Sequence, residues 1–487
     1  MKGVSIKARK KLLLTLSLIA LSYFIALLLF GIKSIWTYQS TKNLYTKFKV
    51  NGYSQEWKSE YLSILPLIDD SINDGAGLLL APMRTALAID KEFSKLIKTY
   101  EMLRPALSVL PELLGLDETK KYLVAFQNSA EARGTGGIIG AYAIAEINGN
   151  LHIREVGTNA RLQSLEQLPI NLPSEFSSIY RSDPAIWQNS NMSPHFPYGS
   201  RIWLALWERQ FQEKLDGVVT VDPIVLKSIL EITGPIQVRN KTISAANVVE
   251  ETLSSSYLDY QSDNQDRKQY LVEIIEGTAS AINDYDFRWN RDLIKLSEPF
   301  IENRIVIYSA ISKFQRVLSR AKISGSMTMQ NNNEFRLVVQ NTAGNKMDYY
   351  LKRQLKVTSK SCKKRRITQV EFALTNTASK DSLLPAYVKG RLDLNLPQGK
   401  ENSTSLSVFV YGPYKSKLIS AIDPATGMSI GYQKSERGRP ALVIPLELQA
   451  GETRKFIADF QGGVGKITTH IQPLVMMQST RIVDKCR

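Results

Sequence analysis

The longest apolar run lies near the start of the chain. Residues 12–32 are uncharged throughout and rich in Leu, Ile and Ala. A helix of this length measures roughly 31 Å, which is enough to cross the hydrocarbon core of a membrane. The pattern therefore predicts one transmembrane helix over residues 12–32.

The charges before this run predict its orientation. Residues 1–11 contain five Lys or Arg side chains and no acid, and basic flanks stay on the cytoplasmic side of a membrane. We therefore expect residues 1–11 to form a cytoplasmic tail, and the bulk of the chain to lie outside a cytoplasmic membrane that it crosses once. A cleaved signal peptide is the alternative. It would have a shorter apolar run ending in small residues, whereas this run ends in Leu-Leu-Leu-Phe-Gly-Ile.

A helical arm is predicted over residues 33–117. Between residues 89 and 114, apolar side chains recur at alternating spacings of four and three, which is typical of one face of a helix. Pro105 and Pro111 interrupt the pattern, so the helix should bend or break there. Packing of the arm on the next domain is the favoured interpretation, and a coiled coil with a partner is the alternative.

Strand and helix patterns alternate over residues 118–322. Residues 122–126 and 138–147 have the pattern of strands, and the sequence Asn-Gly-Asn after the second run predicts a hairpin into residues 151–156. This mixture of strands and helices predicts one α/β domain. Its other predicted elements are helices over residues 201–215, 223–232 and 267–283, a helix that begins near residue 245, and a strand over residues 217–221.

The character of the chain changes again over residues 323–487. Short runs of alternating apolar and polar residues dominate, for example 335–339, 369–374 and 405–411, with Gly, Pro, Asn and Ser between them. Short strands at this spacing are typical of a β-sandwich. The predicted fold class is therefore an α/β (α+β) domain that follows a transmembrane helix and a helical arm, and precedes a β-sandwich.

Charge and rare residues narrow the chemistry. The net charge is +16, so an anionic partner is expected, and the predicted topology argues against nucleic acid. The three His and two Cys have no zinc-ligand spacing. Cys362 and Cys486 form either a disulfide or two free thiols, and the sequence leaves both open. The basic run at 360–366 is either a solvated loop or a contact with an anionic polymer or membrane surface.

Two familiar motifs fail on their context. Residues 427–431 read Gly-Met-Ser-Ile-Gly, but a nucleophile elbow needs a strand before it and a helix after it, and neither is predicted here. Residues 134–140 are rich in Gly, but they lead into a strand, whereas a dinucleotide-binding loop opens a helix. Neither a catalytic serine nor a Rossmann site is expected.

The most informative segment is the loop that ends the first predicted strand. Residues 126–137 place two amides, an acid, an arginine and two hydroxyls beside a Gly-rich turn. A fixed guanidinium next to free backbone N–H groups suits phosphate oxygens, and Glu131 could hold a divalent cation that bridges them. A tight turn that only enters a strand is the alternative.

Three segments of the chain together resemble a known family. Residues 122–140, 215–223 and 230–236 resemble, in this order, the bacterial family of unknown function DUF4012. That family is distantly similar to the LytR–CpsA–Psr phosphotransferases, which are single-pass membrane proteins that move glycopolymers from polyprenyl pyrophosphate to the cell wall. The shared features are an anchor, an early Arg loop, an Asp-Gly-Val-Val strand and a late helix that opens with Asp266 and Arg267.

The resemblance implies a pyrophosphate clamp. Arg133 and Arg267, with Asp266, would carry the chemistry, and Mg²⁺ would be held near Glu131 or Asp183. The other residues implied in ligand binding are Asn128, Thr135, Gly136, Gly137, Arg161 and Arg201. The chain departs from the relatives after Arg133, because Gly134 and Thr135 stand where they have Asp.

The sequence thus favours a membrane-anchored, extracytoplasmic cell-envelope protein. Its α/β domain would bind a lipid-linked pyrophosphate glycan, and in the enzymatic version of this hypothesis it would transfer the glycan to the wall as a phosphotransferase. The alternative is a non-enzymatic structural or adhesive protein that binds through its β-sandwich. The sequence leaves open whether the protein is an enzyme.

Overall fold

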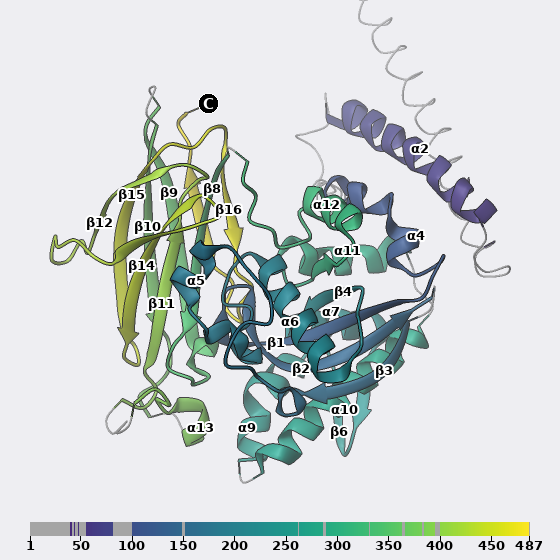
Figure 1. Ribbon diagram of the computed structural model, residues 1–487, viewed down its shortest axis with the longest axis horizontal. Helices are drawn as coiled ribbons and strands as arrows, with labels where there is room; N and C mark the ends of the chain where they lie inside the picture. Colours follow the sequence, from purple (N-terminus) through teal and green to yellow (C-terminus); the bar gives the residue numbers. More distant parts are fainter. Residues whose placement is uncertain are drawn as a thin grey trace, which may run out of the picture. The chain divides into compact units, whose positions relative to one another are not determined.

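Strands and helices are placed by a computed structural model (Figure 1). It describes residues 39–40, 43, 47, 55–80, 100–148, 151–261, 263–285, 289–330, 332–362, 366–381, 384–394 and 400–486. The contacts divide the chain into two units, Met1–Glu118 and Thr119–Arg487. The predicted transmembrane segment, residues 12–32, lies outside the described residues. None of the helices that are described combines the length and the apolar character needed to cross a membrane.

The described part of the first unit is helical. It contains α2 (Gln55–Leu80), a helical segment at residues 100–107 and the short α4 (Leu110–Leu113). The Tyr61 hydroxyl of α2 donates to the carbonyl oxygen of Leu107 at 2.9 Å, so the two segments pack on each other. Residues 81–99, which hold much of the predicted apolar stripe, lie outside the described residues.

The first sheet of the second unit has five strands in the order β3-β2-β1-β4-β7. Strand β4 runs parallel to β1, and the other neighbours are antiparallel. Ile147 of β2 pairs with Leu151 of β3, which confirms the hairpin predicted from Asn-Gly-Asn. The strands are β1 (Lys120–Arg133), β2 (Gly136–Ile147), β3 (Leu151–Thr158), β4 (Gly217–Val221) and β7 (Val306–Ser309).

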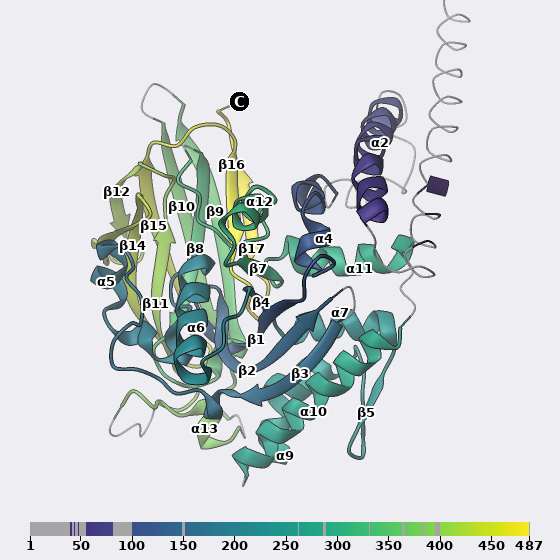
Figure 2. The same ribbon diagram turned by 45° about the vertical axis from the view of Figure 1, so that its right-hand side comes forward.

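Helices cover both faces of this sheet. Side chains alternate between the two faces along each strand, and both sets in β1 include apolar residues that need cover. On one face, α6 (Phe196–Phe211) packs Trp203 and Trp207 in one core with Leu123 of β1. On the other face, Phe126 packs against the core of α7 (Pro223–Thr233) and α10 (Asn264–Asn283). Figure 2 shows α10 running beside β3. The fold class is therefore mixed α/β, as predicted.

Shorter elements connect the helices and strands of this part. The carboxylate of Asp222 caps α7 by accepting from the N–H groups of Ile224 and Val225, both at 3.0 Å. The connecting elements are η1 (Asn159–Arg161), α5 (Ser174–Tyr180), η2 (Asp183–Ala185), η3 (Trp187–Asn189), β5 (Ile236–Val238), β6 (Lys241–Ile243), α8 (Val248–Glu250), η4 (Glu251–Ser255), α9 (Ser256–Asp259), α11 (Trp289–Ile301) and α12 (Ser312–Arg320).

Two further five-stranded sheets follow in the C-terminal region, with orders β12-β15-β10-β9-β17 and β13-β14-β11-β8-β16. Apolar side chains of both sheets, among them Leu337 and Phe372, form one shared core, which is the two-layered arrangement expected of a sandwich. The elements are β8 (Asn333–Asn341), η5 (Met347–Tyr350), β9 (Leu351–Ser361), β10 (Ile367–Asn376), α13 (Ala386–Lys389), β11 (Thr404–Tyr411), β12 (Lys417–Ile422), β13 (Tyr432–Glu436), β14 (Arg439–Leu448), β15 (Thr453–Gln461), β16 (Ile467–Ile471) and β17 (Ser479–Val483).

A disulfide closes this region. Cys362, just after β9, is bonded to Cys486, just after β17, across a sequence separation of 124 residues. The bond fixes the last strand, which pairs in parallel with β9 at the edge of its sheet. Of the two alternatives for these cysteines, the structure therefore has the disulfide. In the basic run at 360–366, residues 363–365 lie outside the described residues, and Arg366 pairs with Asp484 at 2.7 Å.

The α/β part and the C-terminal sheets meet through a buried polar cluster as well as apolar contacts. The Glu436 carboxylate is fully buried and accepts from the hydroxyls of Tyr180 (2.9 Å), Tyr411 (2.7 Å) and Ser193 (2.5 Å). Burial raises the pKa of Glu436 above its ordinary value. Tyr180 and Ser193 precede the β-rich region in sequence, so these bonds join the two parts of the second unit.

Candidate functional site

A bulge in β1 shapes the loop that the sequence singled out. Asn128 pairs with Ile138 and Ala132 pairs with Gly137, so residues 129–131 have no partner on β2. The close approach of the two strands requires glycine at 137, because a Cβ atom there would overlap the carbonyl of Asn128. The bulge carries Glu131 out of the regular ladder.

Residues from beyond β8 fill the space beside the bulge. The Glu131 carboxylate pairs with the ammonium group of Lys346 and, at 3.1 Å, with the guanidinium group of Arg133. The Asp348 carboxylate accepts from the N–H of Ala132 at 2.8 Å. Burial raises the pKa of Asp348 to about 6, and the neighbouring Glu131 charge adds to this effect.

Arg133 is bonded on every side by the protein itself. Its Nε donates to Asn189 at 3.0 Å, its Nη1 donates to the carbonyls of Ala132 (2.8 Å) and Asn341 (3.3 Å), and its Nη2 donates to Glu131. Arg133 as a whole is 7% exposed. This guanidinium group therefore holds the bulge in place and offers little to a phosphate.

Arg267 has a different environment. It lies in the first turns of α10, where Asp263 caps the helix, and its guanidinium carbon lies 4.2 Å from the ring centroid of Tyr257. Its Nε donates to Asn264 at 3.1 Å, but its buried Nη1 has no hydrogen-bond partner among the described residues. The Tyr257 hydroxyl in turn accepts from Asn128 of β1 at 3.1 Å.

Arg267, Lys268 and Lys346 together form what we call the cationic cluster. Burial lowers the pKa of Lys268, and repulsion from Arg267 and Lys346 lowers it further. Burial also opposes the charge of Lys346, but Glu131, Tyr257 and Tyr387 outweigh it and raise its pKa. Within the part of the chain that is described, Lys268 has no acidic partner. Positive charge is therefore in excess here.

Asp266 lies beside Arg267 in sequence but faces a different set of groups. Its carboxylate pairs with Arg239 at 2.8 Å, and Arg239 also pairs with Glu273 at 2.8 Å. These interactions hold the β5–β6 turn against α10, and the hydrogen bond from Arg239 lowers the pKa of Asp266. The structure does not bring Asp266 into the cationic cluster.

Three other predicted residues lie at exposed positions. Arg161 ends η1, Asp183 begins η2 and Arg201 is in the first half of α6. Arg201 donates to the carbonyl of Asn171 at 3.5 Å. None of the three is brought to Arg267 by a contact among the described residues.

The Gly-rich turn is satisfied internally. Thr135 accepts from Asn191 Nδ2 at 2.8 Å, and the N–H of Gly137 donates to Gln127 Oε1 at 3.0 Å. Gly136 has a φ of 143°, which favours glycine. These contacts match the tight-turn alternative. Of the predicted set, the structure joins Asn128, Glu131, Arg133 and Arg267 into one chain of contacts.

The predicted Mg²⁺ ligands do not form a site of the expected kind. Both oxygens of Glu131 face cations, and Asp183 is exposed on a short 3₁₀ turn. Among the described residues, no group of three or more His, Cys, Asp or Glu side chains is placed to hold a metal ion. The residues therefore do not fit Mg²⁺.

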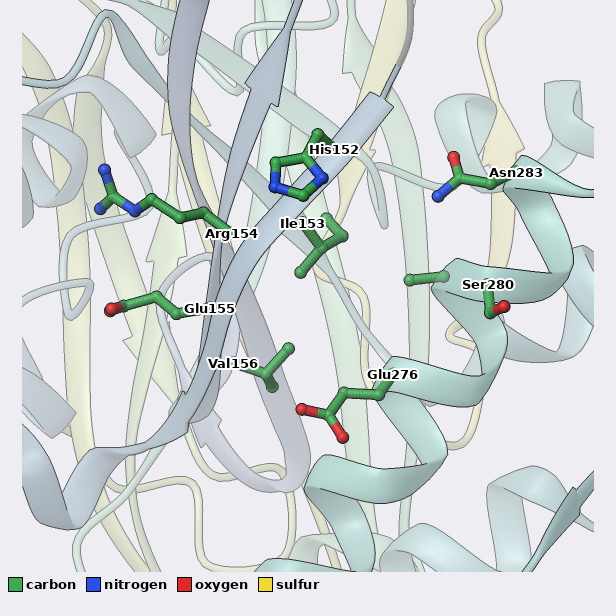
Figure 3. A pocket seen from close by; sticks show the side chains of 9 residues that line it. His152, Ile153, Arg154, Glu155, Val156, Glu276, Ser280 and Asn283 are labelled. Atoms are coloured by element: carbon green, nitrogen blue, oxygen red, sulfur yellow. The ribbon is translucent and has the colours of Figure 1, made fainter.

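A shallow hollow of about 260 Å³ lies between β3 and α10, and His152 and Glu155 are among its lining residues. Figure 3 shows Glu276 and Asn283 reaching from α10 towards the strand. Arg154, which also lines it, is paired with Glu213 at 2.6 Å. No predicted site residue lines this hollow, so we place the candidate site at the cationic cluster.

Sequence reasoning missed the residues that come from the C-terminal region. Lys346 is 215 positions from Glu131, and no periodic pattern relates residues so far apart. The only local signal was the polar and aromatic segment at residues 344–350, which lies between two predicted strands. Lys268, next to Arg267, was within reach of the same reasoning that selected Arg267.

Comparison with known proteins identifies one region. Residues 117–257 match the family described as "Protein of unknown function (DUF4012)". We refer to residues 117–257 as the DUF4012 domain. This domain holds β1 with its bulge, and it ends at Tyr257, which stacks on Arg267. A search of curated proteins gives no match.

Solved structures give only weak similarities. The transcriptional regulator yvhJ from Bacillus subtilis is 11% identical, with 44% of this chain and 84% of that one covered and a TM-score of 0.21. The Lin1025 protein from Listeria innocua is 9% identical, with 45% and 85% covered and a TM-score of 0.22. Protein gbs0355 from Streptococcus agalactiae is 12% identical, with 42% and 74% covered and a TM-score of 0.25.

Proposed function

We propose that the cationic cluster binds the phosphates of a lipid-linked pyrophosphate glycan at the outer face of a cytoplasmic membrane. The observation that carries the proposal is the excess of positive charge at Arg267, Lys268 and Lys346. Among the described residues, Glu131 is the acid that contacts this cluster, and it is shared with Arg133.

The energetics favour an anion at this place. The three cations are partly out of water and repel one another. The lowered pKa of Lys268 reflects its burial first and this repulsion second. A bound pyrophosphate would remove the repulsion and supply an acceptor for the free Nη1 of Arg267. Binding should therefore be accompanied by proton uptake at Lys268 at pH values near its lowered pKa.

The type of anion follows from the donors. A guanidinium group that is already fixed by a tyrosine ring loses little entropy when it binds a phosphate oxygen. The predicted anchor over residues 12–32 would keep the site near a membrane, where pyrophosphates are carried on lipids. The resemblance to the LytR–CpsA–Psr proteins points to the same ligand class. The proposal concerns binding of the glycan. Its transfer to the wall would be a later step.

The decisive variant replaces Arg267 and Lys268 together by Ala in the full chain. Titration calorimetry with polyprenyl pyrophosphate and with inorganic pyrophosphate should show a loss of affinity of about 100-fold, because each lost charge-assisted bond costs roughly 1.5 kcal/mol or more. The matched control is Arg209→Ala with Lys214→Ala. It removes the same charge from exposed positions near the C-terminal end of α6 and should bind as the wild type does.

Unchanged affinity in the Arg267/Lys268 variant would overturn the proposal. The cluster would then be a structural feature, and the non-enzymatic, β-sandwich-centred hypothesis would take its place. Circular dichroism of the variant separates a loss of binding from a loss of folding.

A further inference from the structure

We infer that Tyr387 is the platform on which the sugar next to the phosphate stacks. The inference rests on the proposed function and adds to it the part of the ligand that gives specificity. Tyr387 lies in α13, outside the DUF4012 domain, and 44% of it is exposed.

The ring of Tyr387 adjoins the cationic cluster. The Lys346 ammonium lies 5.3 Å from its centroid, and the ring of Tyr257 lies 6.1 Å away at an angle of 35°. The backbone holds this arrangement, because the N–H of Lys346 donates to the carbonyl of Val388 at 2.9 Å. Arg267, Tyr257, Tyr387 and Lys346 therefore form one continuous series of contacts, and the Tyr387 ring is its exposed member.

An exposed aromatic ring at this position suits a sugar. A pyranose has a face of C–H groups that packs on an aromatic ring, and hydroxyls that accept from a neighbouring ammonium group. Both partners are present here, because the Lys346 ammonium lies 5.3 Å from the ring centroid and belongs to the cationic cluster. The first sugar of a lipid-linked glycan is bonded directly to the phosphate, so it must lie within about one ring's width of the cluster.

The lipid chain is the other apolar group on the same pyrophosphate. A polyprenyl chain needs an extended apolar surface, whereas the Tyr387 ring lies beside the charged Lys346 and the phenol of Tyr257. This polar setting favours the sugar.

Three probes separate these alternatives in the full chain: inorganic pyrophosphate, polyprenyl pyrophosphate, and polyprenyl pyrophosphate that carries one N-acetylhexosamine. The Tyr387→Ala variant should bind the sugar-bearing probe about tenfold more weakly and the other two as the wild type does. Tyr387→Phe, which keeps the ring, should bind all three normally. Tyr432→Ala is the matched control, because Tyr432 is 51% exposed on the edge strand β13 and should change nothing.

Each contrary result has a distinct meaning. Equal losses for both lipid probes would show that Tyr387 contacts the lipid, and no loss with the sugar-bearing probe would show that it contacts nothing; either outcome overturns the inference. Failure of the proposed function itself is seen separately. In that case the Arg267/Lys268 variant would bind inorganic pyrophosphate as tightly as the wild type.

Discussion

The buried Glu131 should contribute more to stability than the lysine it pairs with. Replacing Glu131 by Gln leaves Lys346 and Arg133, which are 4% and 7% exposed, without their shared carboxylate. Replacing Lys346 by Met leaves Glu131 still paired with Arg133 at 3.1 Å. The two substitutions break the same ion pair, but only the first leaves buried cations unneutralised.

The expected magnitudes follow from this asymmetry. An uncompensated buried charge costs about 3–5 kcal/mol, so Glu131→Gln should lower the free energy of unfolding by that amount. Lys346→Met removes one charge-assisted bond and should cost about 1.5–3 kcal/mol. Glu131→Gln should also bind inorganic pyrophosphate more tightly, because its carboxylate no longer competes with the anion for Lys346.

Urea unfolding followed by tryptophan fluorescence measures both effects on stability. Trp187, Trp203 and Trp207 are fully buried in the α/β part, so their emission reports its unfolding. Glu208→Gln is the control, since Glu208 faces Lys214 at 3.6 Å on the surface, and it should cost less than about 1 kcal/mol. A Lys346→Met variant that is as unstable as Glu131→Gln, or more so, would refute the reasoning.

Three further outcomes are expected. Replacing Cys362 and Cys486 by Ser should lower the free energy of unfolding by up to about 5 kcal/mol, because the bond closes a loop with a sequence separation of 124. Added reductant should have the same effect on the wild type and none on the variant. Burial raises the pKa of Asp348 to about 6 from 3.8, so the folded protein holds a proton there that the unfolded chain releases. The free energy of unfolding should therefore fall as the pH rises from about 4 to 6. It should fall less in Asp348→Asn, as measured by urea unfolding at each pH. Gly137→Ala should abolish soluble expression because its Cβ overlaps a carbonyl, whereas Gly140→Ala, whose nearest contact would be 3.7 Å, should express normally.

Local pattern predicted most of the regular structure. The strand at 217–221 matches β4, and the helix expected over 223–232 is α7 (Pro223–Thr233). The helix expected over 267–283 begins three residues earlier, because Asp263 rather than a later residue caps it. Ser429 is exposed, pairs with Ile422 in an isolated bridge and lies between β12 and β13, so the helix that a nucleophile elbow requires does not follow it.

The candidate site was predicted only in part, for a physical reason. The residue types in the loop of β1 indicated polar groups. They did not indicate which of these groups form hydrogen bonds within the protein and which stay free for a ligand. Arg133 and Arg267 look alike in sequence, yet the first is saturated by four acceptors and the second has a free donor. That difference depends on Asn189 and Asn341, which only the folded chain brings to Arg133.

The bulge of β1 has a consequence for how the DUF4012 domain can be inherited. The N–H of Ala132 needs the Asp348 carboxylate, and the carbonyl of Arg133 accepts from Gln472 at 2.6 Å. The acceptor, Asp348, and the donor, Gln472, both come from the C-terminal region. A fragment that stopped at residue 322 would therefore leave the N–H of Ala132 and the carbonyl of Arg133 without these partners. Residues 117–257 therefore do not form an independent folding unit. A recombination event that exchanged them between proteins would also have to exchange the C-terminal sheets.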